Sequence, residues 1–326
     1  MINRRHVLMT KILVGFMLCG FASSIRAQSL PRPKLVVGIV VDQMRWDFLY
    51  RYYDRYEAGG FKRLLNEGFS CENTFINYLP SYTAPGHTTI FTGSVPAISG
   101  IAGNDWIDQN TGRHWYCTED TSVQSVGTTS DEGKMSPKNL LVSTITDELR
   151  LATNFQSKVI GVSLKDRASI LPTGHTANGA FWFDDATGNF ITSTYYMKEL
   201  PAWLKDFNDK RVPEKLVAND WSTLYPVNTY KQSTEDDEPW EGIFGGEKAS
   251  TFPHHVSALY KQNKGFIRSS PFGNSLTLQL AEAALDGNKM GQGTATDFLT
   301  INCASTDYVG HMFGPNSIEV EDVYLR

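Results

Sequence analysis

The sequence contains no apolar run long enough to cross a bilayer, whose core is about 30 Å thick. Its most apolar stretch, residues 12–22, is preceded by basic residues and followed by a small-residue site that ends at Ala27. This layout is typical of a secretory signal peptide cleaved after Ala27. We therefore expect residues 1–27 to be removed, which leaves a periplasmic or secreted chain without a membrane span. A lipoprotein attached through Cys19 and a buried first helix are the alternatives.

Basic residues are too few to indicate a nucleic-acid partner. The chain has 30 Lys and Arg against 35 Asp and Glu, and removal of residues 1–27 deletes four of the bases. The mature chain then has 26 bases and a formal net charge of −9. Because a nucleic-acid binder presents a basic surface to phosphates, we expect no nucleic-acid binding.

Cysteine is also scarce, with four residues in the whole chain and three after Ala27. In an exported protein Cys71 and Cys117 are able to form a disulfide, with Cys303 buried as a small apolar side chain. The spacing alone does not establish this pairing. Repeats and low-complexity tracts are absent as well, and the remaining length suits one large domain or a core with an insertion.

The chain does contain short apolar, β-branched runs that alternate with helical patterns. Residues 35–41 form an unbroken apolar run of the kind found in strands buried on both faces. Further strands are expected at 70–77, 158–164 and 296–302, and helices at 61–68, 85–91, 140–151 and 275–285. This alternation predicts an α/β domain with a mainly parallel central sheet and helices on both faces.

Residues 176–277 have a different texture, with aromatic residues, prolines and turns in place of the regular alternation. Two aromatic runs flank Asp185-Ala-Thr-Gly188 and predict a hairpin. We interpret 176–277 as an insertion that covers the active edge of the sheet. The last residues, 319–326, have helical periodicity and no cap, so we expect residues 28–326 to be an incomplete catalytic domain.

Three predicted element ends carry side chains suited to metal binding. Asp42 directly follows the first strand, Thr83 precedes a helix, and Asp307 and His311 lie four positions apart after the last strand. A spacing of four puts a carboxylate and an imidazole on one face of a helix, where both can bind one ion. In α/β domains, ligands gather beyond the carboxyl ends of the strands. Taken singly, however, Asp42 and Thr83 are also explained as helix caps.

Five separated segments together resemble the alkaline phosphatase superfamily, and within it the secreted phosphate-irrepressible alkaline phosphatases. This branch neighbours the nucleotide pyrophosphatase/phosphodiesterases. The segments are 41–47 (VDQMRWD), 80–89 (PSYTAPGHTT), 100–106 (GIAGNDW), 163–167 (SLKDR) and 305–311 (STDYVGH). They occur in the family's order, and the resemblance runs from Leu35 to the last residue. It implies an exported hydrolase of small phosphate monoesters that works with two zinc ions.

The resemblance also implies roles for individual residues. Asp42 and Thr83 would bind one zinc ion, and Asp307 and His311 would bind the other. Thr83 would be the nucleophile that becomes phosphorylated, at a helix N-terminus where the helix dipole and the zinc favour its alkoxide. His87 is interpreted as a structural hydrogen-bonding residue rather than a ligand.

The family's remaining zinc ligands are an Asp-His pair and a further His from later in the chain. They have no counterpart before Arg326, and the adjacent pair His254-His255 lies out of order, before the Asp307 segment. We therefore expect the remaining ligands beyond residue 326. An isolated 326-residue product is expected to bind zinc poorly, because four-coordinate zinc normally has three or more protein ligands.

Three polar residues correspond to phosphoryl contacts in the family. Asn104 would donate its amide to a phosphoryl oxygen, with a simple turn residue as the alternative. Lys165 and Arg167 alternate at the end of a predicted strand and are expected to point the same way. There, one cation would neutralise a phosphoryl oxygen and the other would clamp two. Solvated surface charge is the alternative for this pair.

Two other functions stay open from the sequence. A phosphodiesterase or nucleotide pyrophosphatase on the same scaffold is disfavoured by Lys165 and Arg167, because a diester has one negative charge fewer than a monoester. A non-catalytic surface protein that binds phosphate or glycans is disfavoured by Thr83, Asp307 and His311. The oligomeric state is not indicated.

Overall fold

A computed structural model describes residues 31–326, and residues 34–326 form one compact unit. The predicted signal peptide, residues 1–27, lies outside the described residues. Within residues 31–326, no helix has both the length and the apolar character needed to cross a bilayer.

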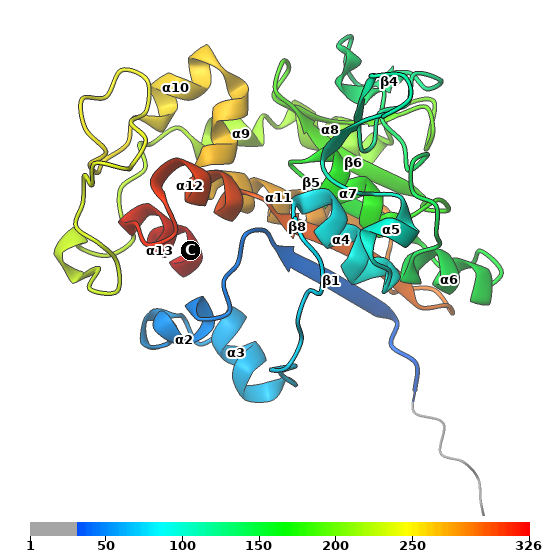
Figure 1. The fold of residues 1–326 in the computed structure, drawn as a ribbon, viewed down its shortest axis with the longest axis horizontal. Coiled ribbons are helices and arrows are strands. Elements are labelled where there is room, and N and C mark those ends of the chain that lie inside the picture. Colours follow the sequence, from blue (N-terminus) through cyan, green and yellow to red (C-terminus); the bar gives the residue numbers. More distant parts are fainter. Residues whose placement is uncertain (1–30) are drawn as a thin grey trace, which may run out of the picture. The chain divides into compact units, whose positions relative to one another are not determined.

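The core of the unit is a six-stranded sheet with the order β1-β8-β5-β6-β7-β4 (Figure 1). The strands β1, β8, β5 and β6 run parallel, and β7 and β4 extend the sheet antiparallel. In chain order the strands are β1 Leu35–Val41, β4 Ser125–Val126, β5 Val159–Ser163, β6 Gly179–Asp184, β7 Asn189–Ser193 and β8 Asp297–Cys303. A separate two-stranded hairpin consists of β2 Asp105–Ile107 and β3 His114–Tyr116. The predicted α/β fold with a mainly parallel sheet is confirmed.

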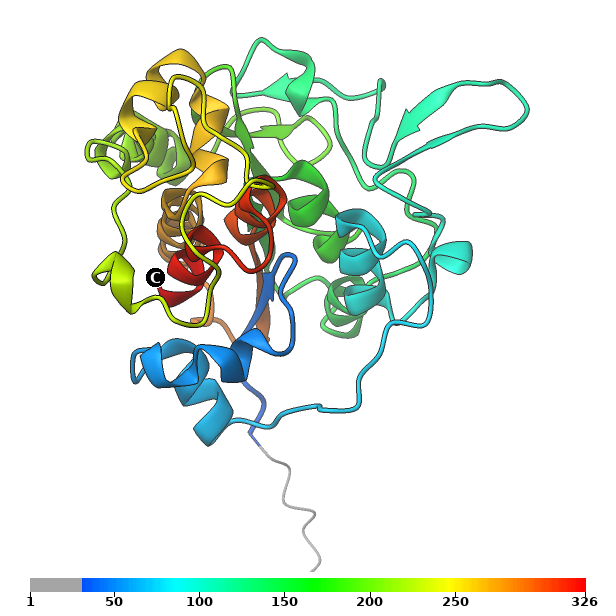
Figure 2. The same cartoon turned by 60° about the vertical axis from the view of Figure 1, so that its left-hand side comes forward.

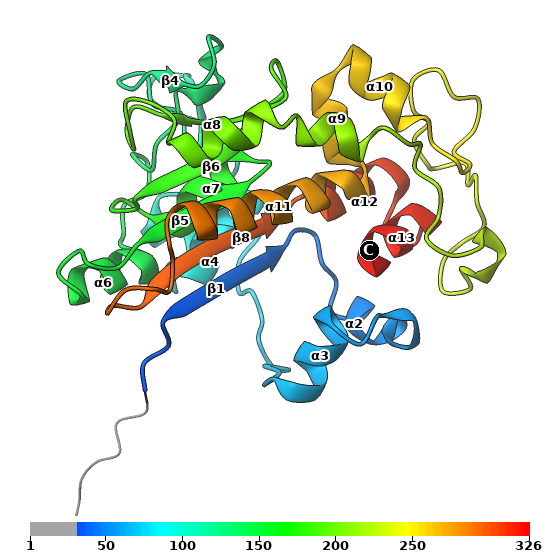
Figure 3. The same ribbon diagram turned by 180° about the vertical axis from the view of Figure 1, so that it is seen from behind.

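Helices cover both faces of the sheet. Helix α11 packs on β8 and β5 with α8 beside it, whereas α7 and α4 lie on the opposite face (Figures 1 and 3). The α-helices are α2 Phe48–Arg51, α3 Gly60–Glu67, α4 Thr83–Thr92, α5 Pro96–Ser99, α6 Ile145–Ala152, α7 Asp166–Thr173, α8 Ala202–Asp209, α9 Val212–Leu216, α10 Val256–Gln262, α11 Pro271–Gly287, α12 Ser305–Phe313 and α13 Ile318–Leu325. Short 3-10 turns are η1 Tyr53–Arg55, η2 Asp131–Gly133, η3 Val227–Thr229 and η4 Lys264–Ser269.

Two predictions at the N-terminal side were wrong, namely the strand at 70–77 and the burial of the first strand on both faces. Residues 70–77 are irregular, and Phe75 is 83% exposed, because no neighbouring strand pairs with this segment. β1 is a strand as predicted, but it lies at the edge of the sheet and is not buried on both faces. Its side chains Val37 and Ile39 are 43% and 54% exposed. An apolar run therefore indicated a strand correctly but not its position in the sheet.

The predicted hairpin at the start of 176–277 is present as β6 and β7. Because β6 pairs parallel with β5, this hairpin lies in the central sheet and does not cover it. The rest of the segment contains α8, α9 and α10 and long irregular stretches. In this respect the interpretation of the whole segment as a cover over the sheet needs correction, since residues 179–193 are part of the sheet itself.

Candidate active site

Three of the segments with predicted site residues meet at the carboxyl edge of the parallel strands. β1 and β8 end in register, with Val41 opposite Cys303, and Ser163 of β5 lies opposite Asn302. Asp42, Lys165 and Asp307 follow these strands within a few residues. The parallel pairing therefore brings together side chains from distant parts of the sequence, as expected for an α/β site.

Lys165 lies at the centre of this group. Its ammonium is 2.7 Å from Asp42 Oδ2 and 2.5 Å from Asp307 Oδ2, and its side chain is 1% exposed. It also lies 4.9 Å from the centre of the Tyr308 ring. Burial raises the pKa of Asp42, but Lys165 outweighs this effect and holds the pKa below its ordinary value. Asp42 is thus kept ionised beside a buried cation.

Thr83 is the first residue of α4, and its hydroxyl faces the same group. Thr83 Oγ1 donates to Asp42 Oδ2 at 3.4 Å and lies 3.4 Å from Lys165 Nζ. The N-cap of α4 is Tyr82, and no side chain caps this helix. The plain N-cap explanation of Thr83 was therefore wrong, since its hydroxyl contacts the charged group and not the helix amides.

His87 supports the site from inside the core. Its Nδ1 is 2.8 Å from the Thr83 carbonyl oxygen, and its Nε2 is 3.0 Å from Asn302 Nδ2. Because Asn302 Nδ2 can only donate, Nε2 accepts and the proton lies on Nδ1, which donates to Thr83. Burial lowers the pKa of His87 and favours the neutral ring. His87 is thus a structural residue, as predicted.

Two buried polar residues beside the site were missed from the sequence. Asn302 accepts from Ser163 Oγ at 2.9 Å and joins β8 to β5 and to α4. Thr306 Oγ1 donates to the Asp42 carbonyl oxygen at 2.6 Å and fixes the end of β1 on α12. Asn302 lies in a segment with an ordinary strand pattern and Thr306 in one with an ordinary helix pattern. Their roles depend on contacts with distant residues, which the sequence does not show.

Asn104 contacts the start of α4. Its Oδ1 accepts from the Ala84 amide at 2.9 Å, which fixes the orientation of the side-chain amide. Within residues 31–326, Asn104 Nδ2 has no hydrogen-bond partner. The amide group is therefore oriented beside Thr83 with its donor side available for a ligand.

Arg167 is placed differently from the prediction. β5 ends at Ser163, so Lys165 is the N-cap of α7 and Arg167 lies in its first turn, not on a strand. The guanidinium Nη1 donates to the Tyr116 hydroxyl at 2.9 Å. Burial lowers the pKa of Arg167, but Tyr116 and Asp166 outweigh it and raise the pKa. Tyr116 was missed because nothing local in the sequence links it to a residue 51 positions later.

Asp307 and His311 lie one turn apart on α12, as the spacing predicted. Asp307 Oδ1 is 3.3 Å from His311 Nε2, and the His311 side chain is 73% exposed. Together with Asp42 and Thr83 they offer carboxylate, imidazole and hydroxyl donors, which suit zinc. In the described part of the chain, no three His, Cys, Asp or Glu side chains are arranged to hold a metal. The donor chemistry fits, but each ion would have fewer than three such ligands from residues 31–326.

The other titratable candidates lie outside this group. His254 is buried between Glu247 and Glu319, with ring nitrogens 2.9 and 3.1 Å from their carboxylates. His255 is 2.8 Å from an oxygen of Asp220. Both histidines are thus engaged elsewhere. Cys71 is exposed and Cys117 is buried, and neither forms a disulfide within residues 31–326.

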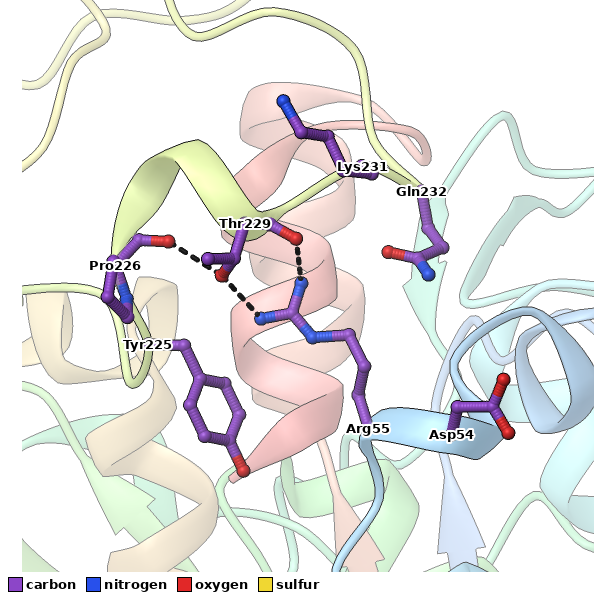
Figure 4. A pocket seen from close by; sticks show the side chains of 7 residues that line it. All are labelled: Asp54, Arg55, Tyr225, Pro226, Thr229, Lys231 and Gln232. Carbon is purple, nitrogen blue, oxygen red and sulfur yellow. Dashed lines mark hydrogen bonds between the residues drawn. The ribbon is translucent and has the colours of Figure 1, made fainter.

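Two hollows also lie away from Thr83. One, of about 530 Å³, surrounds Arg55, whose guanidinium donates to the carbonyl and hydroxyl oxygens of Thr229 (Figure 4). The other, of about 460 Å³, is mainly apolar and includes Ile39, Leu64 and Leu278. Neither hollow is lined by Asp42, Thr83, Lys165 or Asp307. The candidate site is therefore defined by convergent polar groups and not by the size of a cavity.

Comparisons with known proteins show the family of the chain. The type I phosphodiesterase / nucleotide pyrophosphatase family matches residues 36–326. The chain is 62% identical over 319 residues to alkaline phosphatase PafA of Elizabethkingia meningoseptica, covering 97% of this chain and 58% of that protein. It is 61% identical over 303 residues to alkaline phosphatase PhoV of Synechococcus elongatus, covering 93% of this chain and 55% of that protein.

Solved structures of PafA are also similar to this chain. The crystal structure of wild-type PafA superposes with a TM-score of 0.89 at 65% identity, over 91% of this chain and 58% of that one. A PafA variant with a threonine, an asparagine, a lysine and an arginine substituted matches with a TM-score of 0.90 at 63% identity, over 91% of this chain and 58% of that one. The chain thus spans a little over half the length of these relatives, and it belongs to the type I phosphodiesterase / nucleotide pyrophosphatase family within the alkaline phosphatase superfamily.

Proposed function

We propose that the protein hydrolyses small phosphate monoesters by transferring the phosphoryl group to Thr83. The observation that carries this proposal is the Thr83 hydroxyl, which starts α4 without capping it and lies 3.4 Å from both Asp42 Oδ2 and Lys165 Nζ. A hydroxyl beside a carboxylate, an ammonium and a helix N-terminus is in a position to be deprotonated and to attack. The relatives named alkaline phosphatases support the same reaction class.

Two zinc ions are part of the proposal. Asp42 and Thr83 would hold one ion, and Asp307 and His311 would hold the other. Zinc bound there would supply Lewis-acid stabilisation of the Thr83 alkoxide and of the leaving oxygen. Lys165 adds a buried positive charge at the same place. The buried hydrogen bonds from Thr306 and His87 keep Asp42 and the start of α4 in position.

The phosphoryl oxygens would be held by Asn104 and Arg167. The free amide donor of Asn104 lies next to the N-terminus of α4, and Arg167 offers a planar fork that suits two oxygens. The PafA variant described above replaces the same four residue types, which supports grouping Thr83, Asn104, Lys165 and Arg167 in one site. Water would then release phosphate from phosphothreonine 83.

A phosphodiesterase is the second candidate, because the matching family includes such enzymes. Lys165 and Arg167 favour the monoester, since two cations match its two charges.

We further propose that the protein is exported, on the basis of the signal-peptide pattern before Ala27. N-terminal sequencing of the mature protein checks this, and a chain that still starts at Met1 would contradict it.

Acid-quenched full-length protein, incubated with an aryl phosphate at full zinc loading, tests the intermediate by mass spectrometry. We expect phosphate on Thr83, loss of the label in Thr83→Ala and its retention in the matched control Ser81→Ala. The reason is that, of the hydroxyls in the described residues, only that of Thr83 contacts both Asp42 and Lys165. Phosphate on Ser81 or Thr88 would overturn the assignment.

A further inference from the structure

The hairpin of β2 and β3 links Asn104 to Tyr116, the residue that bonds Arg167. Asn104 immediately precedes β2, and Tyr116 is the last residue of β3, which pairs with Asp105. The hairpin projects from the rest of the unit (Figure 2). Its base is closed by a backbone hydrogen bond of 2.9 Å from the Cys117 amide to the Asn104 carbonyl oxygen. Asn104 and Tyr116 are therefore held at fixed positions side by side.

Tyr116 holds one side of the Arg167 guanidinium. Its hydroxyl accepts from Arg167 Nη1 at 2.9 Å, so this nitrogen is occupied. Arg167 Nε is buried and has no partner among the described residues. The Nε and Nη2 donors form the side-on fork of a guanidinium, which matches two oxygens of one phosphoryl group. Tyr116 thus occupies the nitrogen outside this fork and leaves the fork itself available.

The Tyr116 hydroxyl is itself fixed. It donates to Asp166 Oδ1 at 2.8 Å, and the second oxygen of Asp166 accepts from the buried Thr118 hydroxyl. The Asn139 amide holds the backbone on both sides of this strand end, at 3.4 Å from the Tyr116 carbonyl oxygen and 3.2 Å from that of Cys117. Asp166 precedes Arg167 in the chain and would attract its guanidinium directly if Tyr116 did not lie between them.

We propose that Tyr116 is a positioning residue for Arg167, and that the β2–β3 hairpin sets the geometry of both Asn104 and Arg167. This inference rests on the proposed function and deepens it. Tyr116 touches no reacting atom. It keeps Asp166 from pairing directly with Arg167 and turns the Nε–Nη2 fork towards the place where a phosphoryl group binds beside Asn104.

The consequence of removing the hydroxyl follows from these contacts. In Tyr116→Phe, Arg167 Nη1 and Asp166 Oδ1 lose their common partner and are free to pair with each other. Such a pair would draw the fork away from the substrate while the positive charge stays in the site. We therefore expect a loss of kcat/KM of roughly tenfold for an aryl phosphate, smaller than the loss of about a hundredfold or more typical of a deleted oxyanion contact.

A double-mutant cycle of Tyr116→Phe and Arg167→Ala tests the proposal in the full-length protein at matched zinc loading. If Tyr116 acts through Arg167, Tyr116→Phe lowers kcat/KM in the wild-type background and has no further effect in Arg167→Ala. Equal losses in both backgrounds, or no loss in either, would overturn it. Tyr53→Phe, whose hydroxyl bonds Asn66 on the distant α3, is the matched control.

A second variant separates positioning from folding. Thr118→Val removes the other hydrogen bond to Asp166 without touching Arg167, and we expect a smaller loss in the same direction. Comparison of an aryl phosphate with an aryl methyl phosphate gives a readout that a purely structural role would not move, since misplacing the fork should narrow the monoester preference. Absence of any hydrolysis by the wild-type protein would instead refute the proposed function, so the two failures are distinguishable.

Discussion

The ammonium of Lys165 lies between two carboxylates and beside the Thr83 hydroxyl, so its removal changes two properties at once. It takes a cation from the proposed substrate site, and it leaves Asp42 and Asp307 facing each other without their shared partner. Among residues 31–326, no carboxylate is in direct contact with Arg167, because its guanidinium bonds Tyr116. The effects of the two cations can therefore be separated by experiment. Substitution of Arg167 is easier to interpret, because it does not break an ion pair.

Arg167→Ala should lower kcat/KM for an aryl phosphate by about a hundredfold and for an aryl methyl phosphate much less. Lys165→Ala should lower both. In zinc-free protein it should also reduce the unfolding free energy by about 3–5 kcal/mol, because a buried ion pair is broken. Kinetics at matched zinc loading and urea unfolding measure these effects. Arg63→Ala, which removes an exposed arginine on α3, is the control. Equal losses of kcat/KM on both substrates in Arg167→Ala would contradict monoester selectivity.

For single residues, the sequence predicted which side chains are suited to bind a ligand, but it did not predict which distant residues those side chains contact. The spacing of Asp307 and His311 predicted one turn of helix, because helical periodicity is local. The partner of Arg167 was not predictable, since Tyr116 reaches it through folding and not through spacing. Lys165 was predicted to point with Arg167, but the end of β5 at Ser163 places the two residues around the first turn of α7.

Helix α6 shows how a local motif links elements near the site. Its N-cap Thr144 and Asp147 form a capping box, and Asp147 also accepts hydrogen bonds from the amides of His175 and Thr176. Burial raises the pKa of Asp147, but hydrogen bonds from His175, Thr144 and Thr176 outweigh it and hold the pKa well below its ordinary value. Gly174 follows α7 with a φ of 65°. The Cβ of any other residue at this position would lie 2.1 Å from Asp147 Oδ2.

Asp147→Asn should reduce the unfolding free energy at pH 7.5 by about 2–3 kcal/mol, as expected for hydrogen bonds to a buried charge. A carboxylate with a lowered folded-state pKa stabilises the protein fully above its unfolded value of about 4, and this stability is lost as the pH falls further. The difference between wild type and variant should therefore shrink towards pH 2. Urea unfolding across this range measures it, and a difference independent of pH would refute the explanation.

Elements with a strong apolar pattern were predicted well, and those that depend on a partner were not. β1, β5, β8, α4 and α11 all lie where the sequence placed them, to within a few residues. Residues 70–77 have strand-like composition but no neighbour to pair with. Similarly, nothing local in β6 and β7 shows whether a hairpin lies over a sheet or joins its edge.

The open side of β1 is a property of the whole unit. β1 lies at one end of the strand order, so within residues 34–326 no strand pairs with its outer edge. Val37 and Ile39 are exposed there, and an apolar hollow of about 460 Å³ adjoins Ile39. An exposed apolar edge strand is a template for pairing with another chain.

The 326-residue protein should therefore self-associate, and Ile39→Lys should weaken this association by roughly ten- to a hundredfold, since about 1.5–3 kcal/mol comes from burying such a side chain. Sedimentation velocity over a concentration series measures the effect. Ile98→Lys on α5 is the matched control, because Ile98 is similarly exposed, at 60%, but lies off the sheet edge. An equal effect of both variants would argue against the edge as the contact.

The strand order has a further consequence for how the molecule assembles. Within residues 31–326, β8 is the last strand in the sequence, yet it lies between β1 and β5. Contacts such as that of Asn302 with Val40 join residues 262 positions apart. Closing such long loops slows folding, because chain entropy must be lost before the contacts form. A nascent chain emerging from the ribosome cannot bring Asp42 and Lys165 to Asp307 until α12 has been translated. The charged group therefore cannot assemble early in synthesis, and the sheet that supports it closes only after translation has passed β8.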